Sequence, residues 1–239
     1  MKELEDYRWF PSVLRNFQTE FIGFVVARFN VYDVFIHHLN SLHLPVQSMT
    51  DLCSGSGEPA FSIFRKSNCF SRLLLSDKFP NALKLKENTI SYEIQSSDVL
   101  AMEFHHGTYY TMFNAFHHFS DEEKIAIVQK IRDSGSAAFI VEVLEPTIFC
   151  LLKILFTTTI GNLLLTPFVR PFSIKRLLFT YLLPVNILTI TFDGVVSVLK
   201  SRSVQQYQRL FATMENAPNT YRLRNGLVTH IIIQIEPEQ

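Results

Sequence analysis

The stretch Val46-Gln-Ser-Met-Thr-Asp-Leu-Cys-Ser-Gly-Ser-Gly57 decides the fold. Its first part, up to Leu52, is a short apolar run typical of a buried strand, and its last part is a glycine turn. Residues 60–66 follow with the apolar spacing of an amphipathic helix. Strand, glycine turn and helix in this order begin a parallel sheet in which helices cross over between strands.

The same alternation continues along the chain. Further strands are predicted at residues 72–77, 92–98, 109–114, 137–143 and in a terminal hairpin at 220–235. Helices are predicted at residues 80–88, from Ser120 onward, and twice within 12–44. Asn225-Gly226 is the strongest short signal for the hairpin turn. We therefore predict a Rossmann-like α/β fold, with a seven-stranded, mostly parallel sheet and helices on both faces.

We expect a single domain over residues 1–239. Its parts are an N-terminal helical cap at 1–45, a core at 46–145, a hydrophobic helical insertion after strand five at 147–192, and a C-terminal helix and hairpin at 193–239.

Composition narrows the classes of function. Lys and Arg number 22, equal to Asp and Glu at 22, so no basic excess is present for neutralising nucleic-acid phosphates. Three cysteines without a C-x-x-C pair favour a reducing compartment. The N-terminal residues, Met1-Lys-Glu-Leu-Glu-Asp6, lack the basic-then-apolar order of a signal peptide. We expect a cytoplasmic protein that binds no nucleic acid.

Three predicted strands end at or beside a carboxylate. Asp51 belongs to the first, Asp77 follows the second, and Asp98 follows the third. Ligands of open parallel sheets bind beyond the carboxyl ends of the strands, where a carboxylate can accept hydrogen bonds from a ribose diol. A dinucleotide site is one interpretation, although Pro59-Ala60 stand where G-x-G-x-x-G would need a third glycine.

Taken together, Asp51-Leu-Cys-Ser-Gly-Ser-Gly57, Asp77, Ser97-Asp98 and Asn114-Ala-Phe-His-His-Phe119 resemble class I S-adenosylmethionine-dependent methyltransferases, in particular their small-molecule branches. The resemblance covers residues 46–145. It implies S-adenosylmethionine as cofactor, with the glycine loop around the methionine moiety, Asp77 on the ribose and Asp98 at the adenine. The cofactor-binding residues it implies are Asp51, Cys53, Ser54, Gly55, Gly57, Asp77, Lys78, Asp98, Val99, Asn114, Ala115 and Phe116. Cys53 departs from the family pattern, which has a glycine there.

Methyl transfer to a hydroxyl or a protonated nitrogen benefits from a base with a pKa near neutrality. His117 and His118 follow the fourth strand, at the ligand-binding edge, and are the candidate catalytic residues, with a structural role as the alternative. No acidic residue stands at convincing ligand spacing from them, so we predict no metal. The resemblance suggests Trp9 and Tyr32 as substrate contacts from an N-terminal lid, with ordinary helix packing as the alternative. Asp193 is a further candidate that could orient the acceptor, or it is only a turn residue of Asp193-Gly194.

Residues 147–192 are almost continuously apolar. The longest uncharged runs, 154–169 and 177–192, have 16 residues each, fewer than the ~20 that cross a bilayer, so we predict no transmembrane helix. Three hypotheses remain for the segment: a lid over an apolar pocket, a peripheral membrane contact, and a homodimer interface.

The predicted function is methyl transfer from S-adenosylmethionine to an oxygen or nitrogen of a small, hydrophobic acceptor such as a secondary metabolite, quinone or lipid. The alternative is a non-catalytic binding or scaffold protein that uses the apolar insertion as a partner or membrane contact. A nicotinamide-dependent oxidoreductase is a third hypothesis.

Overall fold

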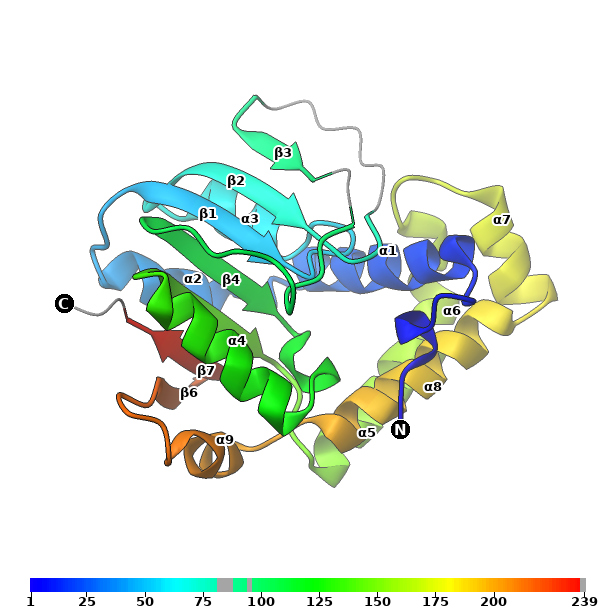
Figure 1. Cartoon of the computed structure of the whole chain (residues 1–239). Helices are drawn as coiled ribbons and strands as arrows, with labels where there is room; N and C mark the ends of the chain where they lie inside the picture. The colour runs from blue at the N-terminus through cyan, green and yellow to red at the C-terminus, as the bar shows by residue number, and fades with distance from the viewer. Residues whose placement is uncertain (81–87, 94–95, 237–239) are drawn as a thin grey trace.

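The centre of the molecule is a seven-stranded sheet with the order β3-β2-β1-β4-β5-β7-β6 (Figure 1). The computed structural model describes residues 1–80, 88–93 and 96–236. Strands β1 to β5 pair in parallel, and β7 runs antiparallel to both β5 and β6. The predicted fold class, a mostly parallel seven-stranded sheet flanked by helices, is confirmed.

The strands are β1 (Gln47–Leu52), β2 (Phe70–Ser76), β3 (Ile90–Tyr92), β4 (Thr108–Phe113), β5 (Ala137–Glu142), β6 (Asn219–Asn225) and β7 (Val228–Ile235). The longer helices are α1 (Ser12–Arg28), α2 (Asp33–Ser41), α4 (Asp121–Asp133), α5 (Ile148–Phe156), α8 (Val185–Lys200) and α9 (Val204–Phe211). Shorter helices are η1 (Leu4–Asp6), α3 (Ala60–Lys66), η2 (Phe116–His118), η3 (Thr157–Gly161), α6 (Asn162–Leu165), η4 (Thr166–Phe168), α7 (Ile174–Leu177) and η5 (Leu178–Leu182).

Each face of the sheet has its own apolar core, because neighbouring residues of a strand point to opposite faces. In β5, Phe139 and Val141 pack toward α2 and α3, whereas Ala138 and Ile140 pack toward α4 and α9. Both sets are at most 2% exposed, so the central strand is buried on both faces. The continuous apolar composition of this strand is explained by that double burial.

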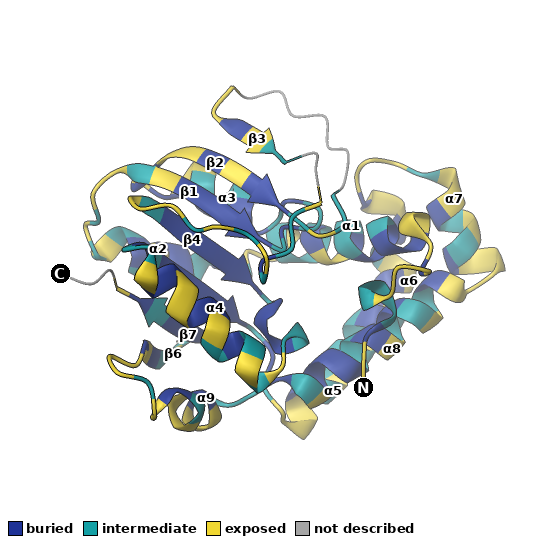
Figure 2. Ribbon diagram, viewed as in Figure 1, coloured by how far each residue is buried: buried dark blue, intermediate teal, exposed yellow. Residues whose placement is uncertain are grey.

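Helices α5 to α8 lie beyond the carboxyl ends of the strands and extend away from the sheet (Figure 1). Helix α1 crosses the same edge and packs on α8 through Phe21 and Ile190. The N-terminal helical cap and the helical insertion after strand five are therefore both present. Their outward faces are exposed over much of α5, α7 and α8 (Figure 2).

The insertion forms a helix longer than its uncharged runs. Ile148–Phe168 is one continuous helix of 21 residues with a mean hydropathy of 1.9, long and apolar enough to cross a membrane by length and composition alone. Lys153 lies within it, and its Nζ donates to the carbonyl of Leu227 at 3.0 Å. A second pair of helices, Ile174–Leu182 and Val185–Lys200, bends by 80° at a break next to Pro184.

Two local expectations differ from the structure, and a third is not tested by it. The third strand ends at Tyr92, so Asp98 lies in the loop beyond it and not at its tip. Asp193 and Gly194 do not form a turn, because α8 passes through them to Lys200 and Asp193 is 5% exposed. The helix predicted at residues 80–88 falls mostly outside the described residues.

Candidate functional site

The glycine loop after β1 folds back on the end of β2. Cys53, Gly55 and Gly57 all have a positive φ, of 56°, 51° and 89°, which lets the chain reverse within five residues. The hydroxyl of Ser54 donates to the Asp51 carbonyl at 2.8 Å and accepts from the amide of Ser76 at 3.1 Å. Ser54 is therefore a buried bridge between the two strands.

Asp51 is buried in β1, where its carboxylate accepts a hydrogen bond from Thr111 Oγ1 at 2.7 Å. Burial raises its pKa to about 7, although the bonds from Thr111 and Ser54 favour the charged form. The nearby charge of Asp77 raises the pKa further. A cation bound at this edge would therefore stabilise the ionised carboxylate.

Asp77 connects the two loops. One carboxylate oxygen accepts from the amide of Gly55 at 2.8 Å, and the other accepts from the amide of Phe79 at 2.7 Å. Lys78 points instead toward Asp98, with 2.6 Å between Nζ and the carboxylate. Asp98 also accepts from the amide of Leu100 at 3.1 Å, so it orders the start of its own loop.

Four carboxylates act on the Cys53 thiol. Burial is the largest reason that its pKa is raised well above the usual value, and the charges of Asp77, Asp51, Asp98 and Asp6 raise it further. Of these carboxylates Asp77 contacts the loop directly, through the amide of Gly55, whereas Asp98 pairs with Lys78 and Asp6 with His118. The thiol is accordingly not a nucleophile.

The segment after β4 crosses the same edge. Asn114 has a φ of 50°, and its side chain accepts from the amide of Val143 at 3.4 Å. Ala115 and Phe116 are buried in the core under α4, where Val99 also lies. Val99 and Phe116 are thus core residues at the base of the site.

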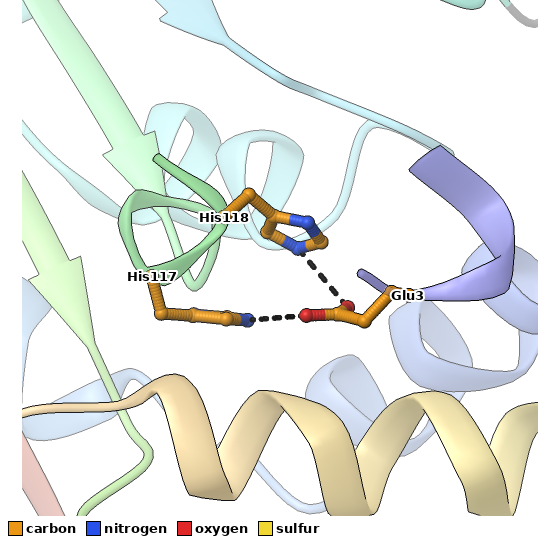
Figure 3. Close-up of side chains that lie close together, drawn as sticks. All are labelled: Glu3, His117 and His118. Atoms are coloured by element: carbon orange, nitrogen blue, oxygen red, sulfur yellow. Dashed lines mark ion pairs between the residues drawn. The ribbon is translucent and has the colours of Figure 1, made fainter. Parts of the chain in front are cut away.

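His117 and His118 lie side by side and both approach Glu3 (Figure 3). Their Nε2 atoms lie 3.8 Å and 3.3 Å from the two oxygens of that carboxylate. His117 is 1% exposed, and its Nδ1 lies 2.7 Å from a carboxylate oxygen of Glu142, which is fully buried. The amide of Phe116 donates to the other oxygen of Glu142 at 2.7 Å. The imidazole of His117 is therefore fixed by a carboxylate on β5.

His118 lies among the carboxylates of the N-terminal turn. Burial alone lowers the pKa of His118, but the hydrogen bond with Asp6 and the charges of Glu3, Asp6 and Glu5 raise it to about 9. The Nδ1 of His118 lies 2.9 Å from Asp6 Oδ1. His118 is therefore an imidazolium at neutral pH, and it holds the acidic N-terminal turn against the end of β4.

Helix α8 holds the same turn from the other side. Asp193 accepts from the amides of Leu4 and Glu5 at 2.5 and 3.3 Å, and Lys200 Nζ lies 3.3 Å from Glu3 Oε1. Burial raises the pKa of Asp193 to about 6. The residue proposed as a substrate contact is thus a cap for η1, which covers the histidine pair.

The two other candidate substrate contacts differ in their surroundings. Trp9 is 68% exposed and stacks on Tyr7 with ring centroids 5.5 Å apart. Tyr32 is 3% exposed in the core behind the sheet, where it packs edge-on against Phe113 and His230. In the described part of the chain Trp9 makes no ring contact or hydrogen bond with the histidine pair. The Tyr32 hydroxyl, in contrast, lies near the buried carboxylates of the site: burial raises its pKa, and the charges of Glu142 and Asp51 raise it further.

Sequence reasoning missed the carboxylates that complete the site. Glu142 is a lone acidic residue in an otherwise apolar strand, a signal that could have marked it as a buried partner. Glu3 and Asp6 come from more than 110 residues away, and no local pattern pairs them with His118. Glu3, His117 and His118 place ligand atoms within 4.8 Å of one another, a set that could hold a metal ion. Each already faces an oppositely charged or hydrogen-bonding partner.

No family model matches the chain, and no curated protein matches it in sequence. Solved structures do match it. Human N-acetylserotonin methyltransferase, determined in complex with S-adenosylmethionine, aligns with a TM-score of 0.51 and 14% identity over 87% of this chain and 53% of that chain. LaPhzM aligns with a TM-score of 0.50 and 17% identity over 87% and 55% of the two chains.

The fold is therefore that of the class I methyltransferases, as the resemblance over residues 46–145 implied. At these identities the likeness concerns the fold alone. The chain spans about half the length of the structures it matches.

Proposed function

We propose that this protein transfers a methyl group from S-adenosylmethionine to an oxygen or nitrogen of a small, hydrophobic acceptor. One observation carries the proposal within this fold: the glycine loop follows the buried carboxylate of Asp51 and is tied to Asp77, whose carboxylate accepts from the amide of Gly55 at 2.8 Å. S-adenosylmethionine carries a sulfonium and an ammonium group, and such cations are favoured where several carboxylates are partly buried.

The same electrostatics argue against a nicotinamide dinucleotide. Its pyrophosphate is anionic and binds at the amide groups of a helix N-terminus. Here Glu58 stands at the start of α3, and its carboxylate accepts from the amide and the hydroxyl of Ser62 at 3.2 and 2.7 Å. A phosphate at this helix start would meet that carboxylate.

The residues present fit the methyl donor. The Gly55–Gly57 loop and Asp51 would hold its methionine end, Asp77 its ribose, and Asp98 its adenine. When bound, this cofactor supplies a methyl group on a positively charged sulfur, ready for in-line transfer. The protein's own share is to position the acceptor and to exclude water.

We assign the proton acceptor of the reaction to His117. Nδ1 of His117 lies 2.7 Å from a carboxylate oxygen of Glu142, and in the tautomer that places the proton on Nδ1 the other ring nitrogen, Nε2, carries a lone pair. Nε2 makes no hydrogen bond with a described residue. A carboxylate that fixes the imidazole tautomer is the arrangement used by general bases. His118 already carries its proton and serves to hold the N-terminal turn. Glu3 occupies the position that an acceptor would take, so that turn must move when the acceptor binds.

Calorimetric titration separates the hypotheses. We expect S-adenosylmethionine to bind and NAD not to bind. Asp77→Ala should weaken the binding at least tenfold, whereas Asp133→Ala, on the outer end of α4, should leave it unchanged. The proposal would be refuted if Asp77→Ala bound S-adenosylmethionine as tightly as the parent protein, or if the parent bound NAD in place of S-adenosylmethionine.

The second candidate is a non-catalytic protein that keeps the fold, and the exposed apolar helices favour it. A labelled-methyl assay against hydrophobic phenols, amines and lipids distinguishes the two. If the protein binds the methyl donor but transfers the methyl group neither to the panel nor to any component of a source extract, it is the non-catalytic protein.

A further inference from the structure

Helices α5 to α8 carry an unusual share of the exposed apolar side chains. Of the 27 large hydrophobic residues exposed in the described chain, 18 lie between Ile148 and Leu199, a segment that is about a fifth of the sequence. Several are more than half exposed, among them Phe156, Phe168 and Leu182. We call this set of 18 side chains the apolar helical surface. A soluble monomer rarely leaves so many contiguous apolar side chains in water.

The first helix of this surface leaves a long apolar side uncovered. The helix Ile148–Phe168 buries only 22% of its most apolar window within the protein. With a rise of 1.5 Å per residue it is about 32 Å long, and over that length its uncovered side can lie along the surface of a bilayer. One side of its first turns packs on α8, through Cys150 and Val198. The helix is therefore attached to the domain along one side and bare along the other.

Nearly all charged residues of this segment are basic. Between Glu145 and Glu215 the only acidic residue is Asp193, which is buried on the inner side of α8. Arg170 and Lys175 are exposed beside the apolar side chains, and neither forms an ion pair with a described residue. Exposed cations next to an apolar face are complementary to anionic lipid headgroups.

An aromatic group lies next to this surface. Phe179, in η5, packs in one cluster with Phe10, and the adjacent Trp9 is 68% exposed with Tyr7 stacked on it. Tryptophan and tyrosine favour the level of the headgroups, where an apolar ring and a polar group are both satisfied. The exposed Trp9, which has no place in the histidine site, is explained by such a position.

We propose that the apolar helical surface docks on an anionic lipid bilayer, with Arg170 and Lys175 at the headgroups. Resting on the proposed function, the acceptor is then a lipid-soluble molecule taken up at that membrane. The surface reaches the site through α8, whose outward residues Leu188 and Phe192 are exposed and whose inward residue Asp193 caps the N-terminal turn.

Flotation of the purified full-length protein with liposomes tests the docking. We expect the protein to float with phosphatidylcholine vesicles that contain 30% phosphatidylglycerol. The triple variant Leu164→Asn, Leu182→Asn, Leu188→Asn should remain at the bottom of the gradient. The matched control, Phe29→Asn, Val46→Asn, Leu227→Asn, replaces three side chains of similar exposure outside the surface and should float like the parent. Arg170→Gln and Lys175→Gln should each lower partitioning into anionic vesicles about fivefold.

Three outcomes would overturn the docking. One is a monodisperse parent protein that floats with neither neutral nor anionic vesicles. Another is a parent that sediments as a dimer without lipid while the triple variant sediments as a monomer, since a second copy would then cover the surface. The third is resistance to extraction with alkaline carbonate, which would indicate a spanning helix. Titration with S-adenosylmethionine keeps the two proposals apart, because the triple variant should bind it normally, and a protein that floats without binding it overturns the function alone.

Discussion

Replacing Glu142 by glutamine tests the assignment of the base most directly. The carboxylate accepts two hydrogen bonds at 2.7 Å, from the Phe116 amide and from Nδ1 of His117. Glutamine has one oxygen to accept with, so its NH2 group must face one of these two donors. If it faces Nδ1, the imidazole changes tautomer and Nε2 gains the proton. His117 can then no longer accept one from a substrate.

Two magnitudes follow from this geometry. Leaving one buried donor without an acceptor costs about 1–3 kcal/mol, which for a chain of this length lowers the melting temperature by about 2–12 °C. Loss of the correct tautomer lowers kcat by up to about 10⁴, the effect that the wrong tautomer has in serine proteases. The affinity for S-adenosylmethionine should stay the same, because Glu142 is not among the residues assigned to the cofactor.

The assay uses two phenols of similar size, one neutral and one already ionised at the assay pH. Glu142→Gln should slow methylation of the neutral phenol by the full factor and that of the ionised phenol only slightly, since the latter needs no base. Glu145→Gln, which loses a surface ion pair with Arg222, is the control and should retain full rates. Equal losses for both phenols in a folded Glu142→Gln protein would refute the role of His117 and assign Glu142 to structure alone.

Other predictions concern stability. Gly57→Ala should cost roughly 2–4 kcal/mol, because φ is 89° and a Cβ would lie 2.2 Å from the Phe61 ring; Gly107→Ala, with a similar φ and open space, should cost only about 1 kcal/mol in the same urea titration. The raised pKa of His118, about 9, means that its share of stability is present below pH 6.5 and lost as the pH rises to 9. That share is about 3 kcal/mol. The unfolding free energy of the parent should therefore fall between pH 6.5 and 9, and that of His118→Gln should fall less; an equally steep fall in both proteins would contradict the role of His118. Chelation should leave the melting temperature unchanged, since the His118 imidazolium already neutralises Glu3; a rise on adding one equivalent of Zn²⁺ would indicate a metal site.

The sheet could be predicted from sequence because its signals are local. A buried strand, a glycine turn and an amphipathic helix each occupy fewer than ten residues, and the connection rules then restrict the topology. The positive φ at Gly55 and Gly57 follows from the same motif. Asp51 and Asp77 were correctly predicted at this edge for that reason.

The remaining features depend on contacts between distant segments. Asp193-Gly194 has the local signal of a turn, yet helix α8 continues through both residues. The buried carboxylate of Asp193 is stabilised there by hydrogen bonds from the amides of Leu4 and Glu5, which a local sequence pattern does not reveal. The partners of His118 were invisible for the same reason, since the N-terminal turn meets β4 only in three dimensions. Asp98 was expected at the tip of a strand over residues 92–98, whereas the pairing of β3 with β2 reaches only from Ile90 to Tyr92.

Helix α8 links the two parts of the protein that the proposals concern. Its inner side fixes Glu3 and the N-terminal turn through Lys200 and Asp193, and its outer side belongs to the apolar helical surface. The N-terminal turn places a carboxylate oxygen of Glu3 next to Nε2 of His117. An acceptor can therefore reach the base only when contacts made by α8 are released. In the proposed complex a bilayer binds the outer side of α8, so this one helix connects the membrane with the turn that covers His117. The apolar side chains that are in excess in the sequence lie on the membrane side of that helix.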